Sequence, residues 1–155
     1  MIELSTQGTV RKSEIYAERG IFRQAAQICM EKFRMNRVHI ITDENVEGLY
    51  LETLIGDFAD IAYAPADGIY GDGESEAEYE FDEENIAYPD FEISYSVIPP
   101  GEASKSLSTI ADIYDSLAEA QITKDDLIIA LGGGVVGDIS GFVAATYMRG
   151  IRLCQ

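Results

Sequence analysis

LIIALGGGVVGDISGF, residues 127–142, is the stretch that decides the fold class. Its first five residues form an apolar run typical of a buried strand, and three consecutive glycines follow. Past Asp138 the pattern predicts a helix. A strand, a glycine loop and a helix in this order are typical of a nucleotide-binding unit in a parallel sheet.

The glycine spacing points to a phosphate ligand. Gly132, Gly134 and Gly137 match the pattern G-x-G-x-x-G. Bare backbone amides and the positive end of a helix both attract a pyrophosphate, so a nucleotide is the leading ligand. Two structural alternatives stay open: the glycines can serve only close strand–helix packing, and Asp138 can serve only as a helix cap.

Strands and helices alternate along the rest of the chain. The pattern predicts a strand pair around residues 9–17, strands at 38–42, 91–97 and from 151, and helices over 21–33, 44–55, 107–118 and from the glycine loop to about 148. This alternation predicts an α/β fold, a Rossmann-like parallel sheet with helices on both faces. Residues 1–155 are expected to form a single nucleotide-binding domain.

Helical spacing also predicts which side chains face the core. The sets are Val46, Leu49, Tyr50 and Leu54 in one helix, and Leu107, Ile110, Ala111, Tyr114, Leu117 and Ala118 in another. Ser104 or Ser106 is expected to cap the second helix. His39, which has no second metal ligand nearby, is expected on a strand surface without a chemical role.

Charge is unevenly distributed. The net charge is −17, and 18 of the 28 acidic residues lie between His39 and Lys105, a segment without any basic residue. A polyanion would be repelled there, which argues against nucleic-acid binding. An acidic insertion is predicted at about residues 67–91, as an exposed strand or hairpin or as a mobile segment.

Several classes are disfavoured by composition. One histidine and two distant cysteines, Cys29 and Cys154, cannot supply a typical His- or Cys-based metal site, and both thiols are expected to be buried and unpaired. No run is long and apolar enough to span a membrane, and the amino terminus has no secretion signal. A cytoplasmic protein is therefore expected.

Four charged residues are candidates for ligand contact. Asp43 follows a strand and can replace the ribose-binding acid that normally lies beyond the glycines. Glu102 and Lys105 lie in a proline-stiffened turn after the next strand. Arg149 offers a guanidinium suited to phosphate or carboxylate, although it could equally satisfy the last carbonyls of its helix.

In these stretches the sequence resembles the 3-dehydroquinate synthase family. The matching segments are TDENV, PGEASKSL, IYDSL, DLIIALGGGVVGDISGFVAATYMRGI and the final Gln155. The resemblance implies an amino-terminal α/β half that binds NAD and a helical half that carries a zinc or cobalt ion and most catalytic groups. The second half is expected to be missing from this chain.

The resemblance also implies roles for individual residues. Arg149 is expected to reach the substrate phosphate, including in a neighbouring subunit. The residues expected to contact the cofactor are Asp43, Asn45, Gly101, Glu102, Lys105, Gly133, Gly134, Val135, Val136, Gly137 and Asp138. No metal ligand is expected in this chain.

The family reaction converts 3-deoxy-arabino-heptulosonate 7-phosphate to 3-dehydroquinate and phosphate in the shikimate pathway, a carbon–oxygen lyase step. Transient oxidation by NAD makes the adjacent proton acidic enough for phosphate elimination. The chain alone is expected to be inactive. It is also expected to form a homodimer or larger assembly, because the surface facing the missing half would be apolar. The alternatives are a fragment of another sugar-phosphate cyclase or polyol dehydrogenase, or a non-catalytic nucleotide-binding or interaction module.

Overall fold

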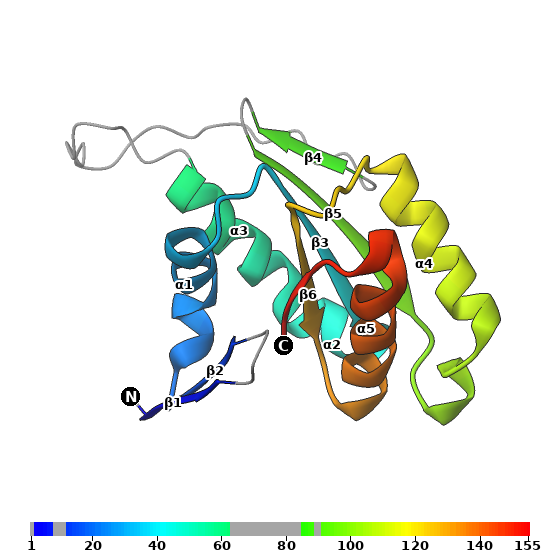
Figure 1. Ribbon diagram of the computed structural model, residues 1–155, viewed down its shortest axis with the longest axis horizontal. Helices are drawn as coiled ribbons and strands as arrows, with labels where there is room; N and C mark the ends of the chain where they lie inside the picture. Colours follow the sequence, from blue (N-terminus) through cyan, green and yellow to red (C-terminus); the bar gives the residue numbers. More distant parts are fainter. Residues whose placement is uncertain (1, 8–11, 63–84, 89–90) are drawn as a thin grey trace.

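A five-stranded sheet lies at the centre of the computed structural model, which describes residues 2–7, 12–62, 85–88 and 91–155 (Figure 1). Its strand order is β4-β5-β3-β6-β7, with bounds β3 (Arg37–Asp43), β4 (Asn85–Tyr88), β5 (Phe91–Ile98), β6 (Leu127–Leu131) and β7 (Arg152–Cys154). Four of the strands are parallel, and only β4 runs antiparallel, beside β5 at one edge. The predicted parallel α/β sheet is confirmed.

The strand order reverses direction at β3. From β3 the chain moves to β5 on one side, and then crosses to β6 on the other side. Loops that leave β3 and β6 therefore diverge to opposite faces of the sheet. In parallel sheets a ligand cleft forms at such a point, outside the carboxyl ends of the strands.

Helices cover both faces and define two apolar cores. The first face carries α1 (Ala25–Lys32) and a continuous helical segment made of α2 (Glu44–Val46), a π-helical turn (Glu47–Leu51) and α3 (Glu52–Ala62). The second face carries α4 (Leu107–Glu119) and α5 (Gly134–Thr146). Alternate strand residues serve the two cores, since Ile40 packs toward the first face and Ile41 toward the second.

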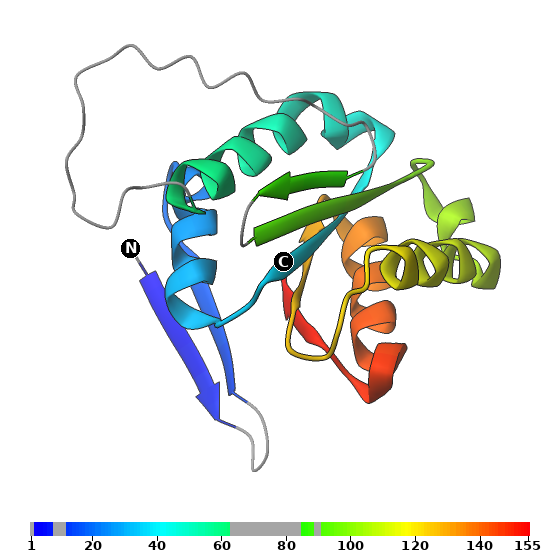
Figure 2. The ribbon, with the colours of Figure 1, turned by 90° about the horizontal axis from the view of Figure 1, so that it is seen from above.

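A hairpin lies apart from the main sheet (Figure 2). Its strands are β1 (Ile2–Gln7) and β2 (Lys12–Ala17), paired antiparallel, and an ion pair between Glu14 and Lys32 connects β2 to α1. The predicted strand pair is confirmed, but its first strand lies earlier than residue 9. Residues 8–11 lie outside the described part of the chain.

The apolar face of the segment after β3 differs from the prediction. Leu54 is buried as predicted, but Leu49 and Tyr50 are 69% and 47% exposed, and Leu51, Ile55 and Phe58 are buried instead. A π-helical turn uses more residues per turn than an α-helix, which shifts the buried face along the sequence and makes the regular spacing misleading. The helix also continues to Ala62, beyond the point where the helical pattern weakens.

The buried face of α4 is likewise rotated from the predicted one. Ile110 and Leu117 are buried as predicted, and Tyr114 is half-buried. The prediction is wrong for Leu107, which is 79% exposed, and for Ala111 and Ala118, whereas Ile113 joins the buried face. The predicted cap is confirmed at Ser106, whose side chain accepts a hydrogen bond from the backbone N–H of the third helical residue. Leu107 directly follows this cap, as the first residue of α4, and its side chain is exposed.

His39 is not on a surface, and that expectation is wrong. Its ring is fully buried between β3 and β5, and its two nitrogens lie 2.8 Å from Ser94 Oγ and 2.9 Å from Ser96 Oγ. Burial lowers the pKa of His39 to about 4. The imidazole is therefore a neutral, hydrogen-bonded part of the core.

The predicted acidic insertion, residues 67–91, lies mostly outside the described residues. Within those bounds the structure describes β4 and the first residue of β5. In the described part of the chain no helix is long and apolar enough to cross a membrane.

Candidate functional site

The candidate site lies where β3 and β6 end side by side. Thr42 Oγ1 donates a hydrogen bond of 2.8 Å to the carbonyl oxygen of Leu131, which ties the last residues of the two strands together. Asp43 and Gly132 follow at once. The loops that carry the predicted acidic residue and the glycines therefore begin next to each other.

Within the glycine loop, the individual glycines serve different purposes. A Cβ at Gly132 would lie 2.7 Å from Val136 Cγ2, so this position is needed for the loop to pack on α5. A Cβ at Gly133 or Gly134 would meet nothing within 4 Å. Packing explains the first glycine, whereas the next two leave an open, exposed backbone surface.

That open surface ends in free amide donors. Gly133 is the N-cap of α5, and no side chain of the described residues caps it. The first intrahelical bond is donated by Gly137 N–H to the Gly133 carbonyl, at 2.9 Å. The N–H groups of Gly134, Val135 and Val136 precede that bond, so α-helix geometry leaves them pointing out of the helix end, where an anion is favoured.

The valines contribute through their backbone. The Val136 side chain is fully buried under Gly132, and Val135 packs partly against the same core. The predicted contacts of these two residues with a cofactor are thus limited to their amides. Their apolar side chains instead fix the helix end in place.

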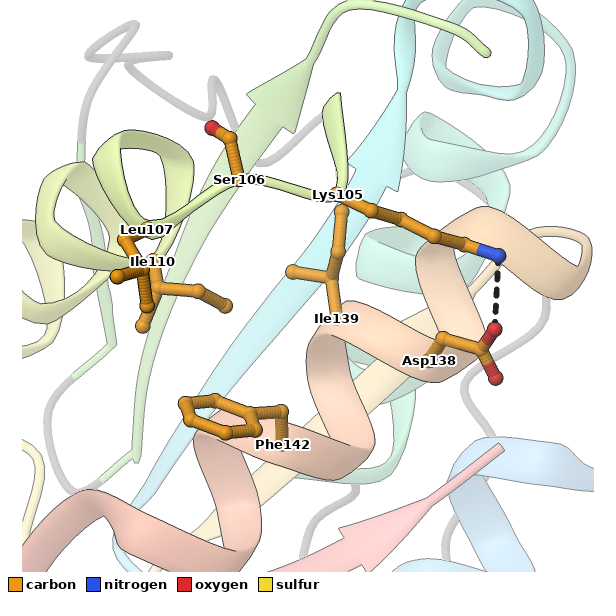
Figure 3. Close-up of a pocket in the computed structure, with 7 residues that line it drawn as sticks. All are labelled: Lys105, Ser106, Leu107, Ile110, Asp138, Ile139 and Phe142. Atoms are coloured by element: carbon orange, nitrogen blue, oxygen red, sulfur yellow. Dashed lines mark ion pairs between the residues drawn. The ribbon is translucent and has the colours of Figure 1, made fainter. Parts of the chain in front are cut away.

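Three of the sequence-predicted residues meet at one ion cluster, which comprises Glu102, Lys105 and Asp138. Lys105 Nζ lies 2.8 Å from Asp138 Oδ2 (Figure 3). The same atom lies 2.9 Å from Glu102 Oε2. The turn that presents Glu102 and Lys105 begins at Gly101, whose φ of 98° favours glycine. The cluster joins the loop after β5 to the first turns of α5.

The ion cluster is exposed and its charge is fixed. The side chains of Glu102 and Asp138 are 78% and 70% exposed, whereas that of Lys105 is 31% exposed. Hydrogen bonds to Asp138 and then to Glu102 raise the pKa of Lys105. The ammonium group of Lys105 therefore stays protonated at neutral pH. Because its two carboxylate partners are exposed to solvent, Lys105 can exchange them for oxygen atoms of a ligand.

A small cavity opens beside the ion cluster, between α4 and α5. Its volume is about 230 Å³, and the lining residues are Lys105, Ser106, Leu107, Ile110, Asp138, Ile139 and Phe142 (Figure 3). One end is charged and the other is apolar. The cavity is smaller than a typical pocket for a whole cofactor, so it suits only one part of a dinucleotide.

Asp43 already has local partners. Its Oδ1 accepts hydrogen bonds from the backbone N–H groups of Asn45 and Val46, at 2.9 and 3.1 Å, and so caps α2. Asn45 is exposed. Both residues lie at the same sheet edge as the glycine loop, because β3 and β6 are parallel neighbours.

Arg149 is separate from this group. It follows the carboxyl end of α5, whereas the glycine loop is at the amino end, and 13 helical residues span about 20 Å. Arg149 is exposed and has a left-handed backbone, with φ of 68°, as does Met148 with 46°. Within one chain it does not reach the residues around Lys105.

The described residues contain no group of three or more His, Cys, Asp or Glu side chains placed to hold a metal ion.

Two features of the site were not predicted from the sequence: the apolar wall of the cavity, formed by Ile139 and Phe142, and the hydrogen bond of Thr42 between the two strands. The repeat of apolar residues after Asp138 was visible in the sequence. Its role depends on how α4 and α5 approach each other, which the sequence pattern does not encode.

Similarity to known proteins covers this whole region. The family model described as 3-dehydroquinate synthase N-terminal matches residues 95–155. A 3-dehydroquinate synthase of Clostridium acetobutylicum is 37% identical over 141 residues, which is 91% of this chain and 32% of that protein. One of Enterococcus faecalis is 42% identical over 119 residues, 77% of this chain and 25% of that protein. The chain thus spans about a third of the length of the curated relatives it matches.

Solved structures share the fold. A crystal structure of 2-deoxy-scyllo-inosose synthase complexed with carbaglucose-6-phosphate, NAD+ and Co2+ matches with a TM-score of 0.69 and 16% identity, over 98% of this chain and 33% of that one. A 2-epi-5-epi-valiolone synthase of Streptomyces hygroscopicus with NAD+ and Zn2+ bound matches with a TM-score of 0.57 and 20% identity, over 94% and 33%. At these identities the matches show a common fold.

Proposed function

We propose that the chain is the NAD-binding part of a 3-dehydroquinate synthase, because nine-tenths of it is similar to such an enzyme and its residues 95–155 match the family model described as N-terminal. The observation that carries the proposal is the convergence of an open glycine loop with Glu102, Lys105 and Asp138 at the strand-order reversal. Solved proteins of the same fold are described with NAD+ bound.

The residues of the site fit a dinucleotide. The amides at the start of α5 suit the pyrophosphate, and the absence of a Cβ at Gly133 and Gly134 lets the phosphates come close. The Lys105 ammonium group and the carboxylates of Glu102 and Asp138 provide donors and acceptors for hydroxyl groups. Bound NAD+ supplies a hydride acceptor, and this chain positions it.

The reaction proposed for the full-length enzyme is conversion of 3-deoxy-arabino-heptulosonate 7-phosphate to 3-dehydroquinate and phosphate, a carbon–oxygen lyase step. We place it in the cytoplasm, as part of the shikimate pathway. The zinc or cobalt ion of the family does not fit the described residues, which offer no set of ligands for it. Residues 1–155 are therefore proposed to be one NAD-binding domain without turnover of its own.

Phosphate release tests this part of the proposal. The chain, prepared free of host enzyme, is incubated with the seven-carbon substrate, NAD+ and Zn2+ or Co2+, and a complete 3-dehydroquinate synthase serves as the positive control. The expected result is no phosphate release above the rate without protein. Phosphate release that grows in proportion to the amount of chain would contradict the proposal that residues 1–155 do not catalyse the reaction alone.

We also propose that the chain self-associates. Leu107, Phe142 and Met148 are 79%, 49% and 55% exposed, which leaves large apolar side chains on α4, on α5 and just after α5. Apolar surface of this kind favours association. Sedimentation velocity at micromolar concentration is expected to show a dimer or larger species, and a single monomer peak would refute the idea.

Arg149 is proposed to contact the substrate phosphate. Its exposure and its distance along α5 from the glycine loop favour contact with a phosphate held by a neighbouring subunit. In a complete enzyme carrying this domain, Arg149→Ala should raise KM for the phosphorylated substrate while NAD+ affinity stays unchanged. An equal loss of both affinities would place Arg149 at the cofactor instead.

A further inference from the structure

The two cysteines of the chain, 125 positions apart, come together on the first face of the sheet. Cys29 lies in α1 and is 2% exposed. Cys154 lies in β7 and packs against the core cluster to which Cys29 belongs. The two side chains lie close enough for each thiol to shift the pKa of the other. The expected burial is confirmed for Cys29, Cys154 is only half-buried, and neither forms a disulfide. Their proximity was not predicted from the sequence.

Contacts on either side of the cysteines hold α1 against β7. The Arg152 guanidinium donates to the carbonyl oxygen of Arg34 at 2.9 Å and lies 5.7 Å from the centre of the Phe33 ring. From Arg152 to Cys154 is two strand residues, about 6.6 Å. From Phe33 back to Cys29 is four residues, about one helical turn or 6 Å. These contacts hold the carboxyl end of α1 beside β7, and Cys154 packs against the cluster that contains Cys29.

The two thiols are not equivalent. Cys154 is half-buried and Cys29 is almost wholly buried, so a small reagent reaches Cys154 first. The contact with Cys29 lowers the pKa of Cys154, whereas the same contact and burial raise the pKa of Cys29. Cys154 is thus the better nucleophile and Cys29 remains a neutral thiol beside it.

From this geometry we propose that Cys29 and Cys154 form a redox-active pair, which closes into an intramolecular disulfide when the chain meets hydrogen peroxide. The Cys154 thiolate attacks one peroxide oxygen, the O–O bond breaks, and the released hydroxide takes a proton to become water. The Cys29 sulfur then attacks the resulting sulfenic acid, an S–S bond forms, and a second water leaves with the Cys29 proton. Two thiols are oxidised and one peroxide is reduced to two waters.

The disulfide would join α1 to the strand beside β6. Cys154 is the register partner of Ile129, in the strand that leads into the glycine loop. A bond between residues so far apart in sequence restricts the unfolded chain strongly. The oxidised chain is therefore expected to melt at a higher temperature than the reduced chain.

Mass spectrometry of the folded 155-residue chain tests the proposal. After brief treatment with hydrogen peroxide, the intact mass should fall by two hydrogen atoms, both thiols should become unreactive to a thiol reagent, and digestion should yield one peptide pair that links Cys29 to Cys154. Dithiothreitol should reverse all three changes. Closure should be at least about tenfold slower in urea, where the thiols are no longer held together.

Single substitutions separate the two roles. In Cys29→Ser, Cys154 should stop at a sulfenic acid that dimedone traps, and in Cys154→Ser, Cys29 should stay reduced. Since Cys29 is buried and its variant could misfold, the wild-type mass measurement stands independently. The proposal is overturned if both wild-type thiols stay reactive, if Cys154 is overoxidised while Cys29 stays reduced, or if disulfides form only between chains.

Discussion

Substitutions at Gly132 and Gly134, two residues apart, test different roles of the glycine loop. Gly132 is needed for packing, and Gly134 is proposed to leave space for a ligand. Gly132→Ala places a Cβ 2.7 Å from Val136 Cγ2 and should lower the free energy of unfolding by about 1–3 kcal/mol. Gly134→Ala meets nothing within 4 Å and lies in the first turn of α5, so it should leave stability unchanged or slightly raised. Urea denaturation of both variants measures the difference.

The same pair distinguishes the two interpretations of the glycine loop. If Gly134 keeps space for a pyrophosphate, Gly134→Ala should weaken NAD+ binding although its fold is intact. Wild-type NAD+ affinity in a stable Gly134→Ala protein would mean that the loop serves only packing.

Because the neutral ring of His39 is buried, we expect the chain to lose stability in acid. Its pKa is about 4 in the folded chain and near 6.5 when exposed, so the unfolded chain binds the extra proton between these values. The contribution of neutral His39 is complete above pH 6.5 and is lost as the pH falls toward 4. The linked change is on the order of 3 kcal/mol for a shift of this size.

Denaturation midpoints between pH 7 and pH 4 check this, with His39→Gln as the comparison. The acidic residues of the chain affect both proteins, whereas only the wild type carries the His39 contribution. The pH slope should therefore be shallower in His39→Gln. Parallel slopes in the two proteins would show that His39 is not buried as a neutral ring.

At the scale of elements, the cap of α4 is the clearest test of a local prediction. Ser106 Oγ accepts from the Thr109 N–H at 3.2 Å, and Ser106→Ala should cost about 1 kcal/mol of stability. Ser116→Ala is the matched control in the same helix, because the Ser116 hydroxyl donates to the carbonyl oxygen of Asp112 and caps nothing, and it should cost less. Equal losses in thermal unfolding would refute the capping role.

Strand and helix order could be predicted from the sequence, because apolar runs and breakers mark elements locally. The strands at β3, β5 and β6 and the helix after Ser106 lie where the pattern puts them. Helix faces could not be predicted as well. The π-helical turn moves the buried face to Leu51, and Leu107 is exposed at the first position of α4. Such effects depend on packing between distant segments.

The candidate site shows the same division. The expectation that strand ends share one edge brought Glu102, Lys105 and Asp138 together correctly, since parallel strands have their carboxyl ends on one side. The burial of His39 and the meeting of Cys29 with Cys154 had no local signal. Both depend on which strands become neighbours in the sheet.

At the scale of the whole molecule, the central claim is that one face of this chain holds NAD+ through the glycine loop and the ion cluster of Glu102, Lys105 and Asp138. Lys105 makes ion pairs in that cluster, while Lys124 is an exposed lysine in the loop before β6. Lys105→Ala and Lys124→Ala therefore remove the same charge from two places, only one of which belongs to the site.

Isothermal titration calorimetry with NAD+ on the wild type and these two variants tests the claim most directly. We predict saturable binding to the wild type, an affinity at least about tenfold lower for Lys105→Ala through loss of a charged hydrogen-bond donor, and no change for Lys124→Ala. Absence of saturable heat up to millimolar NAD+ in the wild type, or equal affinities in all three proteins, would contradict it.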